Sequence, residues 1–225
     1  MLKIWVGVIA VSSILLGAGT CAHAEEGSSN LTSKQKAEIQ QAKLETNKLK
    51  KSMDSQKSPK FYGDKKVAES GTISAAATTW KRKGIFYVTT DTASSGSSAW
   101  AGGHAGISYN SYYAIESFGN KGSALNGVNL WDNNWNSRYI HFKALSTHNT
   151  TVAQDASTAD KAYTYAGLKP YNYNFFNINQ DNSFYCSQLV WYAYMKKLNI
   201  DLNDGGAVWP VDLTQTSKAY TVYSQ

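Results

Sequence analysis

The chain has 225 residues, enough for one domain of ordinary size with an extension. It carries 22 Lys and Arg against 16 Asp and Glu, a formal net charge of +6, and the basic residues are spread along the sequence without an aromatic-interleaved basic stripe. This distribution argues against a nucleic-acid-binding protein. Beyond the N-terminus, no segment is long and apolar enough to span a membrane as a helix.

The first 24 residues have the layout of a secretory signal peptide. Lys3 gives a positive start, residues 4–17 are apolar and uncharged, and Ala22 and Ala24 supply both small residues of an A-x-A cleavage site. An apolar core of about 15 residues is too short to span a bilayer. A lipoprotein signal ending at Cys21 is the alternative, but the leucine expected three positions upstream is missing. We therefore expect cleavage after Ala24 and a secreted or cell-envelope-associated protein.

Residues 25–79 are predicted to form a tail and linker ahead of the domain. The stretch from Thr32 to Ser55 is rich in Lys, Gln, Glu and Ala and contains no Gly or Pro, which favours a helix. Its apolar residues are sparse and follow no strict heptad. Two interpretations stay open: a solvated helix or tether, and a pro-segment that covers an active site. Residues 56–79 are expected to be a linker.

The domain is predicted to occupy residues 80–225. Abundant Trp and Tyr, together with only 3 Pro, favour a strand-rich structure. Strands are expected at 84–90, in a hairpin over 104–119, at 139–145 and, as a short strand, at 171–176. Helices are expected at 152–167, where Gly167 and then Pro170 provide stop signals, and at 183–198.

Cys186 is the only cysteine that remains if the signal is removed after Ala24. An odd cysteine in a secreted protein indicates a dimer bridge or a reactive thiol, and a small buried hydrophobic residue is the third interpretation. Asn182 and Ser183 are good N-cap residues, so Cys186 is expected in the first turn of its helix. The helix dipole there favours the thiolate, the nucleophilic form of the side chain.

The predicted hairpin brings a histidine and a glutamate to one face. Its apolar side chains occupy odd-numbered positions, so the two strands share an apolar face only if the loop has an odd number of residues. A three-residue loop at 109–111 meets this condition and pairs His104 with Glu116 and Ile107 with Tyr113. Glu116 could then hold one nitrogen of His104 and leave the other for a thiol. A plain cross-strand ion pair is the alternative.

Other potential sites carry weaker signals. His141 and His148 are seven positions apart, a poor spacing for shared metal ligation, and the chain has no C-x-x-C, P-loop or G-x-G-x-x-G motif. We therefore expect no metal and no cofactor. Trp131, Trp135 and Tyr139 recur at four-residue spacing and are interpreted either as a packing stripe or as a surface that stacks on sugar rings.

Three segments together resemble a known family. "GHAGI", then "AIES" on the next strand, then "FYCSQLVWYAY" on a later helix, are similar to the permuted NlpC/P60 group of papain-like proteins, in particular its YiiX/YebB-like members. The order His, Glu, Cys is that of the circularly permuted group, whereas ordinary papain-like enzymes place the cysteine helix first. The resemblance covers roughly residues 84–213 and leaves the tail outside.

The resemblance implies an α+β, circularly permuted papain-like fold with an antiparallel sheet packed against the cysteine-bearing helix. It also implies Cys186 as nucleophile, His104 as general base and Glu116 as the group that orients the imidazole. The backbone N–H of Cys186 is a natural oxyanion donor. A second donor is not identified, and the candidates are Tyr173, Tyr185 and Gln180.

The expected function is that of an exported cysteine hydrolase that cleaves amide bonds, with a cell-envelope peptide or peptidoglycan as its substrate. One alternative is a thiol-dependent lipid acyl hydrolase or transferase. The other is a non-catalytic module that binds cell-wall glycan, in which Cys186 is merely buried.

Overall fold

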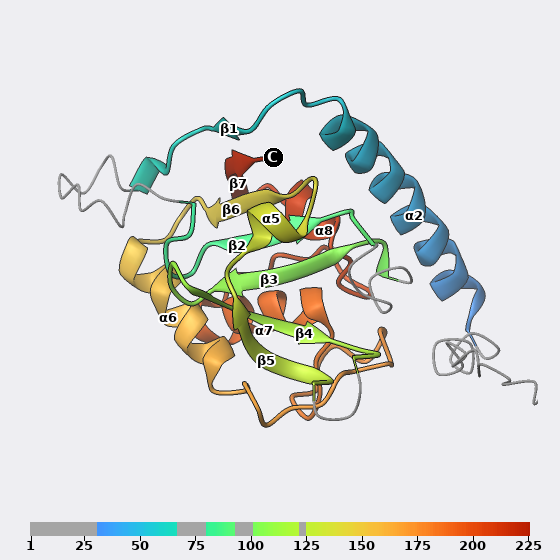
Figure 1. Ribbon diagram of the computed structural model, residues 1–225. Helices are drawn as coiled ribbons and strands as arrows, with labels where there is room; N and C mark the ends of the chain where they lie inside the picture. Colours follow the sequence, from blue (N-terminus) through green and yellow to red (C-terminus); the bar gives the residue numbers. More distant parts are fainter. Residues whose placement is uncertain (1–30, 67–79, 93–100, 122–124) are drawn as a thin grey trace, which may run out of the picture.

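The structure is a computed structural model that describes residues 31–66, 80–92, 101–121 and 125–225. Within these residues, one antiparallel sheet of seven strands forms the centre of the molecule (Figure 1). In spatial order the strands are β1 (Lys60–Phe61), β7 (Ala219–Ser224), β6 (Lys143–Thr147), β2 (Phe86–Thr89), β3 (His104–Ser108), β4 (Tyr113–Phe118) and β5 (Gly127–Asp132). Helices flank the sheet, so the expected α+β fold is confirmed. The predicted signal peptide, residues 1–24, lies outside the described residues.

The two faces of the sheet are covered by different helices. One face carries the larger apolar core, which includes residues of α6 (Val152–Tyr163) and α7 (Cys186–Leu198). The other face carries a smaller core that includes Trp135 of α5 (Trp135–Arg138). Ala105, Ile107 and Ile115 belong to the first core and Ala114 to the second, so the predicted alternation of the hairpin is confirmed.

The predicted register of the hairpin is wrong by two residues. Ser108 pairs with Ala114, and Gly106, not His104, lies opposite Glu116. With this pairing the loop has five residues. The Asn110 side chain stabilises the wider turn, because it accepts hydrogen bonds from two backbone N–H groups at the hairpin tip. An odd loop length is retained, and so the residues keep their predicted faces.

The cysteine helix begins later than predicted. Its first residue is Cys186, and Tyr185 occupies the N-cap position. The expected caps, Asn182 and Ser183, instead lie in a turn in which both backbone N–H groups donate to the side chain of Gln180. Cys186 still lies in the first turn, as the sequence indicated.

Other element boundaries also shift. The helix predicted over 152–167 ends at Tyr163, and the chain continues to Gly167 in turns. The strand predicted over 139–145 is displaced to β6, because the residues just before it form α5. Residues 171–176 form no strand in this described part of the chain, where Tyr171 makes an isolated bridge to Phe184.

The N-terminal extension contains the predicted helix, α2 (Ser33–Asp54), which begins with a capping box between Thr32 and Gln35. One side of α2 is not solvated, because Ala42, Leu49 and Met53 are buried. Figure 1 shows α2 lying along one side of the domain.

Residues 60–66 are held to the rest of the sheet by β-strand pairing and by buried ion pairs. β1 pairs with β7, and Arg82 binds both Asp64 (2.7 Å) and Asp155 (2.8 Å) in the interior. Lys66 also contacts Asp155 at 2.8 Å. Buried ions of opposite sign must be paired to offset their loss of hydration. These contacts place residues 60–66 in the same folded unit as the strands, ahead of the boundary at Trp80 expected from composition.

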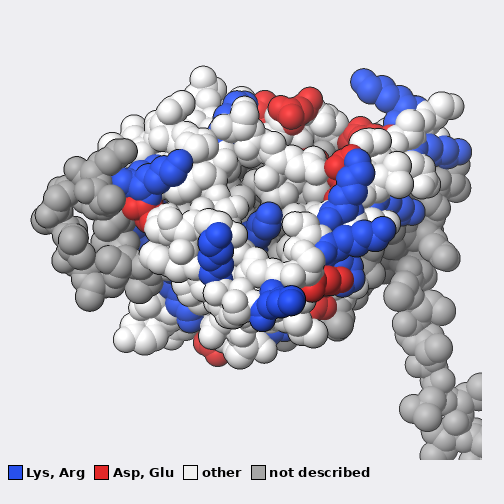
Figure 2. All heavy atoms as spheres, turned by 90° about the horizontal axis from the view of Figure 1, so that it is seen from above, with Lys and Arg blue, Asp and Glu red and all other residues white. Residues whose placement is uncertain are grey.

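Charge on the molecular surface is mixed. Figure 2 shows Lys and Arg side chains dispersed over one face, with Asp and Glu side chains among them. Among the described residues, no helix has the length and apolar character needed to cross a membrane.

Candidate active site

The structure brings Cys186, His104 and Glu116 together. Cys186 opens α7, and His104 is the first residue of β3. The Cys186 sulfur accepts a hydrogen bond from the Ala105 backbone N–H and is also hydrogen-bonded to the His104 side chain. His104 belongs by alternation to the face of the sheet opposite α7. Because it lies at the end of its strand, its ring reaches the sulfur at the helix N-terminus.

The other side of the imidazole is held by Glu116. His104 Nε2 and Glu116 Oε2 are 2.8 Å apart, and both side chains are buried. Since Nε2–H donates to the carboxylate, Nδ1 is the nitrogen that faces Cys186. The two residues are diagonal neighbours in the sheet, and Glu116 reaches His104 across Gly106. The predicted pairing partner was therefore wrong, but the predicted contact is present.

Gly106 provides the space for this contact. A Cβ atom at this position would lie 2.7 Å from Cγ of Glu116 and 3.1 Å from the Trp135 ring. Both distances are shorter than ordinary contacts of a real Cβ atom. The glycine is required here by crowding, and its backbone is not in the left-handed region.

We expect Gly106→Ala to destabilise the fold by about 1–3 kcal/mol, the usual cost of overpacking, and to displace Glu116 from His104. Urea unfolding measures the stability. In a Glu116→Ala background the Glu116 Cγ and carboxylate are absent. The stability lost on Gly106→Ala should then be smaller, because only the close contact with Trp135 remains. Equal costs in the two backgrounds would show that Glu116 does not lie over Gly106.

Two further residues bind Glu116 and were not identified from the sequence as part of the site. Trp135 Nε1–H donates to Glu116 Oε1 at 3.1 Å, and the Arg138 guanidinium forms an ion pair with the same oxygen. With His104, they give this buried carboxylate three donors. The only sequence signal was the four-residue spacing of Trp131, Trp135 and Tyr139, which had been interpreted without reference to Glu116.

Aromatic rings pack around the imidazole. The His104 ring lies nearly parallel to Phe118 (centroids 4.2 Å apart) and to Trp135 (5.7 Å). Trp135 and Tyr139 are fully buried, whereas Trp131 is only partly buried and meets the edge of Phe118. The packing interpretation is confirmed for Trp135 and Tyr139, which are not available to stack on a sugar.

The electrostatics shift Cys186 and His104 each toward its charged form. Burial by itself raises the pKa of Cys186, but the hydrogen bond and charge of His104 and the Ala105 N–H outweigh it, so the pKa is lowered. Burial by itself lowers the pKa of His104, but Cys186 and Glu116 outweigh it and raise the pKa. For Glu116, burial is outweighed by His104 and Arg138, and the pKa is lowered.

The other histidines lie elsewhere. His141 contacts the carbonyl of Gln225 and lies 3.6 Å from Asp54, and His148 packs on Tyr220. In the described part of the chain, no group of three or more His, Cys, Asp or Glu is arranged to hold a metal ion.

The candidates for a second oxyanion donor are engaged in other hydrogen bonds. The Tyr185 hydroxyl donates to the Phe175 carbonyl, and the Gln180 amide donates to the Ser183 carbonyl. Tyr173 donates to Asn120. None of these three contacts is directed at Cys186.

Comparison with known proteins finds one matching family, one similar protein and one similar structure. The model of a family described as "Permuted papain-like amidase enzyme, YaeF/YiiX, C92 family" matches residues 62–225. YycO of Bacillus subtilis (strain 168), described as uncharacterized, is 31% identical over 94 residues, which are 39% of this chain and 38% of that protein. The crystal structure titled as metalloprotein yiiX from Escherichia coli O157:H7 aligns with a TM-score of 0.49 at 16% identity, covering 63% of this chain and 96% of that one.

Proposed function

Because the chain belongs to the permuted papain-like amidase family, a family of cysteine-hydrolase type, we propose that it is an exported enzyme that cleaves amide bonds in cell-wall peptides. One observation carries the proposal: a single imidazole is hydrogen-bonded to a thiol on one side and to a carboxylate on the other. This is the arrangement that nucleophilic acyl transfer requires.

Each residue has one role in this mechanism. The Cys186 thiolate attacks the carbonyl carbon and forms a carbon–sulfur bond. His104 gives its proton to the leaving nitrogen as the carbon–nitrogen bond breaks. A water molecule then loses a proton to His104 and attacks the thioester, the carbon–sulfur bond breaks, and the carboxylic acid leaves with the thiolate and the protonated His104 restored. Glu116 orients the imidazole and stabilises its positive form throughout.

The oxyanion formed in this reaction needs donors. The backbone N–H of Cys186 is at the first position of α7, where it has no acceptor within the helix. The partial positive charge of the helix N-terminus adds to its effect. We assign this N–H as the first oxyanion donor.

The substrate and the location rest on different support. The family supports the amide bond, and the predicted signal peptide supports export and, with it, a substrate in the cell envelope. The lipid acyl alternative would use the same three residues on an ester. A glycan-binding module has less support, because Trp135 and Tyr139 are buried and Cys186 is hydrogen-bonded to an imidazole.

We expect the pKa of Cys186, measured by the pH dependence of alkylation with iodoacetamide, to lie below about 8.5, the ordinary value of a free thiol. The reason is the imidazolium of His104 beside the sulfur. Peptide mapping identifies the labelled residue. His104→Ala should move the midpoint upward, and His148→Ala, a matched change away from the site, should not. A midpoint at or above the ordinary value would remove the catalytic assignment.

The same preparation tests the substrate. Hydrolysis of cell-wall stem peptides and of a phospholipid ester is followed side by side, with the Cys186→Ala variant as the blank. Thiol-dependent cleavage of the peptide supports the proposal, and cleavage of the ester alone supports the lipid alternative.

A further inference from the structure

The catalytic residues are buried, and the helix α2 packs on segments near them from outside the region matched by the family. Cys186 and His104 are each 1% exposed. The family model begins at Tyr62, whereas α2 ends at Asp54. The helix α2 is therefore an addition to the domain on which the enzymatic proposal rests.

Residues 207–209 are bound to the two residues that flank Cys186 in the chain. The Ser187 hydroxyl donates to the Val208 carbonyl (2.6 Å), and the Val208 N–H donates to the Tyr185 hydroxyl (2.8 Å). The two chain neighbours of Cys186 are thus both fixed to Val208. Residues 207–209 are therefore held beside the start of α7, where Cys186 lies.

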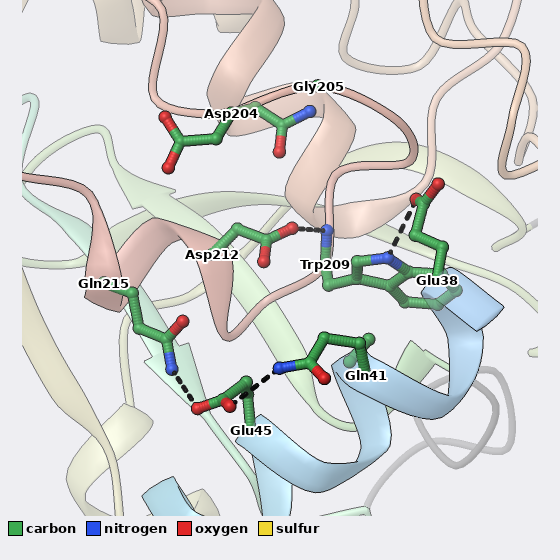
Figure 3. A pocket seen from close by; sticks show the side chains of 10 residues that line it. Glu38, Gln41, Glu45, Asp204, Gly205, Trp209, Asp212 and Gln215 are labelled. Carbon is green, nitrogen blue, oxygen red and sulfur yellow. Dashed lines mark hydrogen bonds between the residues drawn. The ribbon is translucent and has the colours of Figure 1, made fainter. Parts of the chain in front are cut away.

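The helix α2 binds residues 207–209 through Glu38. Its carboxylate accepts a hydrogen bond from the Ala207 N–H (2.6 Å). It also accepts one from Trp209 Nε1–H (3.3 Å), which Figure 3 shows. It lies against Gly206, where an added Cβ would be 2.4 Å from the carboxylate oxygens. The Glu38 carboxylate therefore occupies space that a side chain at position 206 would fill.

Further along, α2 reaches the histidine side of the site. An added Cβ at Gly102, two residues before His104, would lie 2.9 Å from the Thr46 hydroxyl. Glu38 and Thr46 are eight residues apart, or about 12 Å along a helix. The helix therefore crosses from the segment beside Cys186 to the segment that leads into His104.

The contact between α2 and the domain is incompletely packed. A cavity of about 410 Å³ lies between them, lined by Glu38 and Glu45 from α2 and by Asp204 and Asp212 from the domain (Figure 3). Among the described residues, no Lys or Arg lines it. The pKa of Asp212 is raised to about 7 because the carboxyl is buried and faces Glu38 and Asp204. Closing α2 over this surface thus has an electrostatic cost at neutral pH.

We propose that α2 is a built-in inhibitory strap, which lies across the catalytic pair of the proposed enzyme and must move away before substrate can reach Cys186. The inference rests on the contacts of Glu38 and Thr46 with the two sides of the site, together with the sealed thiol. A helix held by few buried side chains and facing like charges is suited to reversible release.

The test replaces one buried residue of α2 in the full chain, with a matched control. Leu49 is buried against the domain, and Leu44 on the same helix is 57% exposed. Leu49→Asp should release α2, seen as loss of hydrogen-exchange protection, and raise the rate of Cys186 alkylation about tenfold or more, because the rate follows the open fraction. Leu44→Asp should change neither quantity. If Leu49→Asp leaves α2 protected, Met53→Asp is added to complete the release.

Two outcomes would overturn the strap. One is release of α2 with no change in the alkylation rate. The other is loss of cooperative unfolding in the released variant, which would make α2 part of the core. Alkylation requires no substrate, so the result is independent of the enzymatic proposal. Faster alkylation without any amide hydrolysis would keep the strap and reject the proposed activity.

Discussion

Replacing Cys186 with alanine is expected to lower amide hydrolysis by about 10⁴-fold or more, because acyl transfer loses its nucleophile. The fold should be retained, since Cys186 occupies a small buried volume and alanine removes only the sulfur. Steady-state kinetics on a stem peptide, with urea unfolding in parallel, separates the two effects.

The matched control is Val190→Ala, one helical turn further along α7 and also fully buried. It removes core volume without removing a reactive group, so it should cost about 0.5–1.5 kcal/mol or somewhat more and leave the hydrolysis rate of the folded protein almost unchanged. Equal losses of activity in both variants would mean that Cys186 serves only the packing of α7.

The second large effect concerns the way in which Glu116 works through His104. His104→Ala should lower kcat/KM by about 10³–10⁴-fold, and Glu116→Gln by about 10²-fold. Gln keeps the shape of Glu116 but loses the charge that stabilises the imidazolium. In the double variant the loss should hardly exceed that of His104→Ala alone, because Glu116 has no imidazole left to orient.

Stability must be measured with activity in this series. Glu116→Gln also removes the charge that pairs with the partly buried Arg138, so the variant is expected to be less stable. Rates are therefore compared without urea, at a temperature where every variant is folded. If the two single losses multiply in the double variant, Glu116 acts independently of His104, and a different residue orients the imidazole.

Local sequence patterns were sufficient for several parts of the structure. The composition of residues 32–55 predicted α2, since helix propensity acts within one segment. The odd-numbered apolar positions fixed which face of the hairpin each residue joins, because side chains alternate along a strand. The same alternation placed His104 and Glu116 on one face.

Contacts between distant segments were decided by the tertiary structure. The register of the hairpin depended on the Asn110 side chain at its tip, which stabilised a five-residue loop in place of three. Arg138 and Trp135 contact Glu116 because α5 folds back over the sheet. Their separation from Glu116 in the sequence gives no sign of this contact.

The N-terminal helix shows the same division. Its sequence determined that it is a helix, but its sparse apolar residues left open whether it is a tether or a cover. The Glu38 carboxylate finds its hydrogen-bond donors only where Gly206, Ala207 and Trp209 are brought to the start of α7 by tertiary packing. Helix formation is governed by interactions within a few residues, whereas docking depends on a surface assembled from both ends of the chain. The sequence by itself therefore determined the reactive residue types and their faces, and the tertiary structure decided how they meet and what covers them.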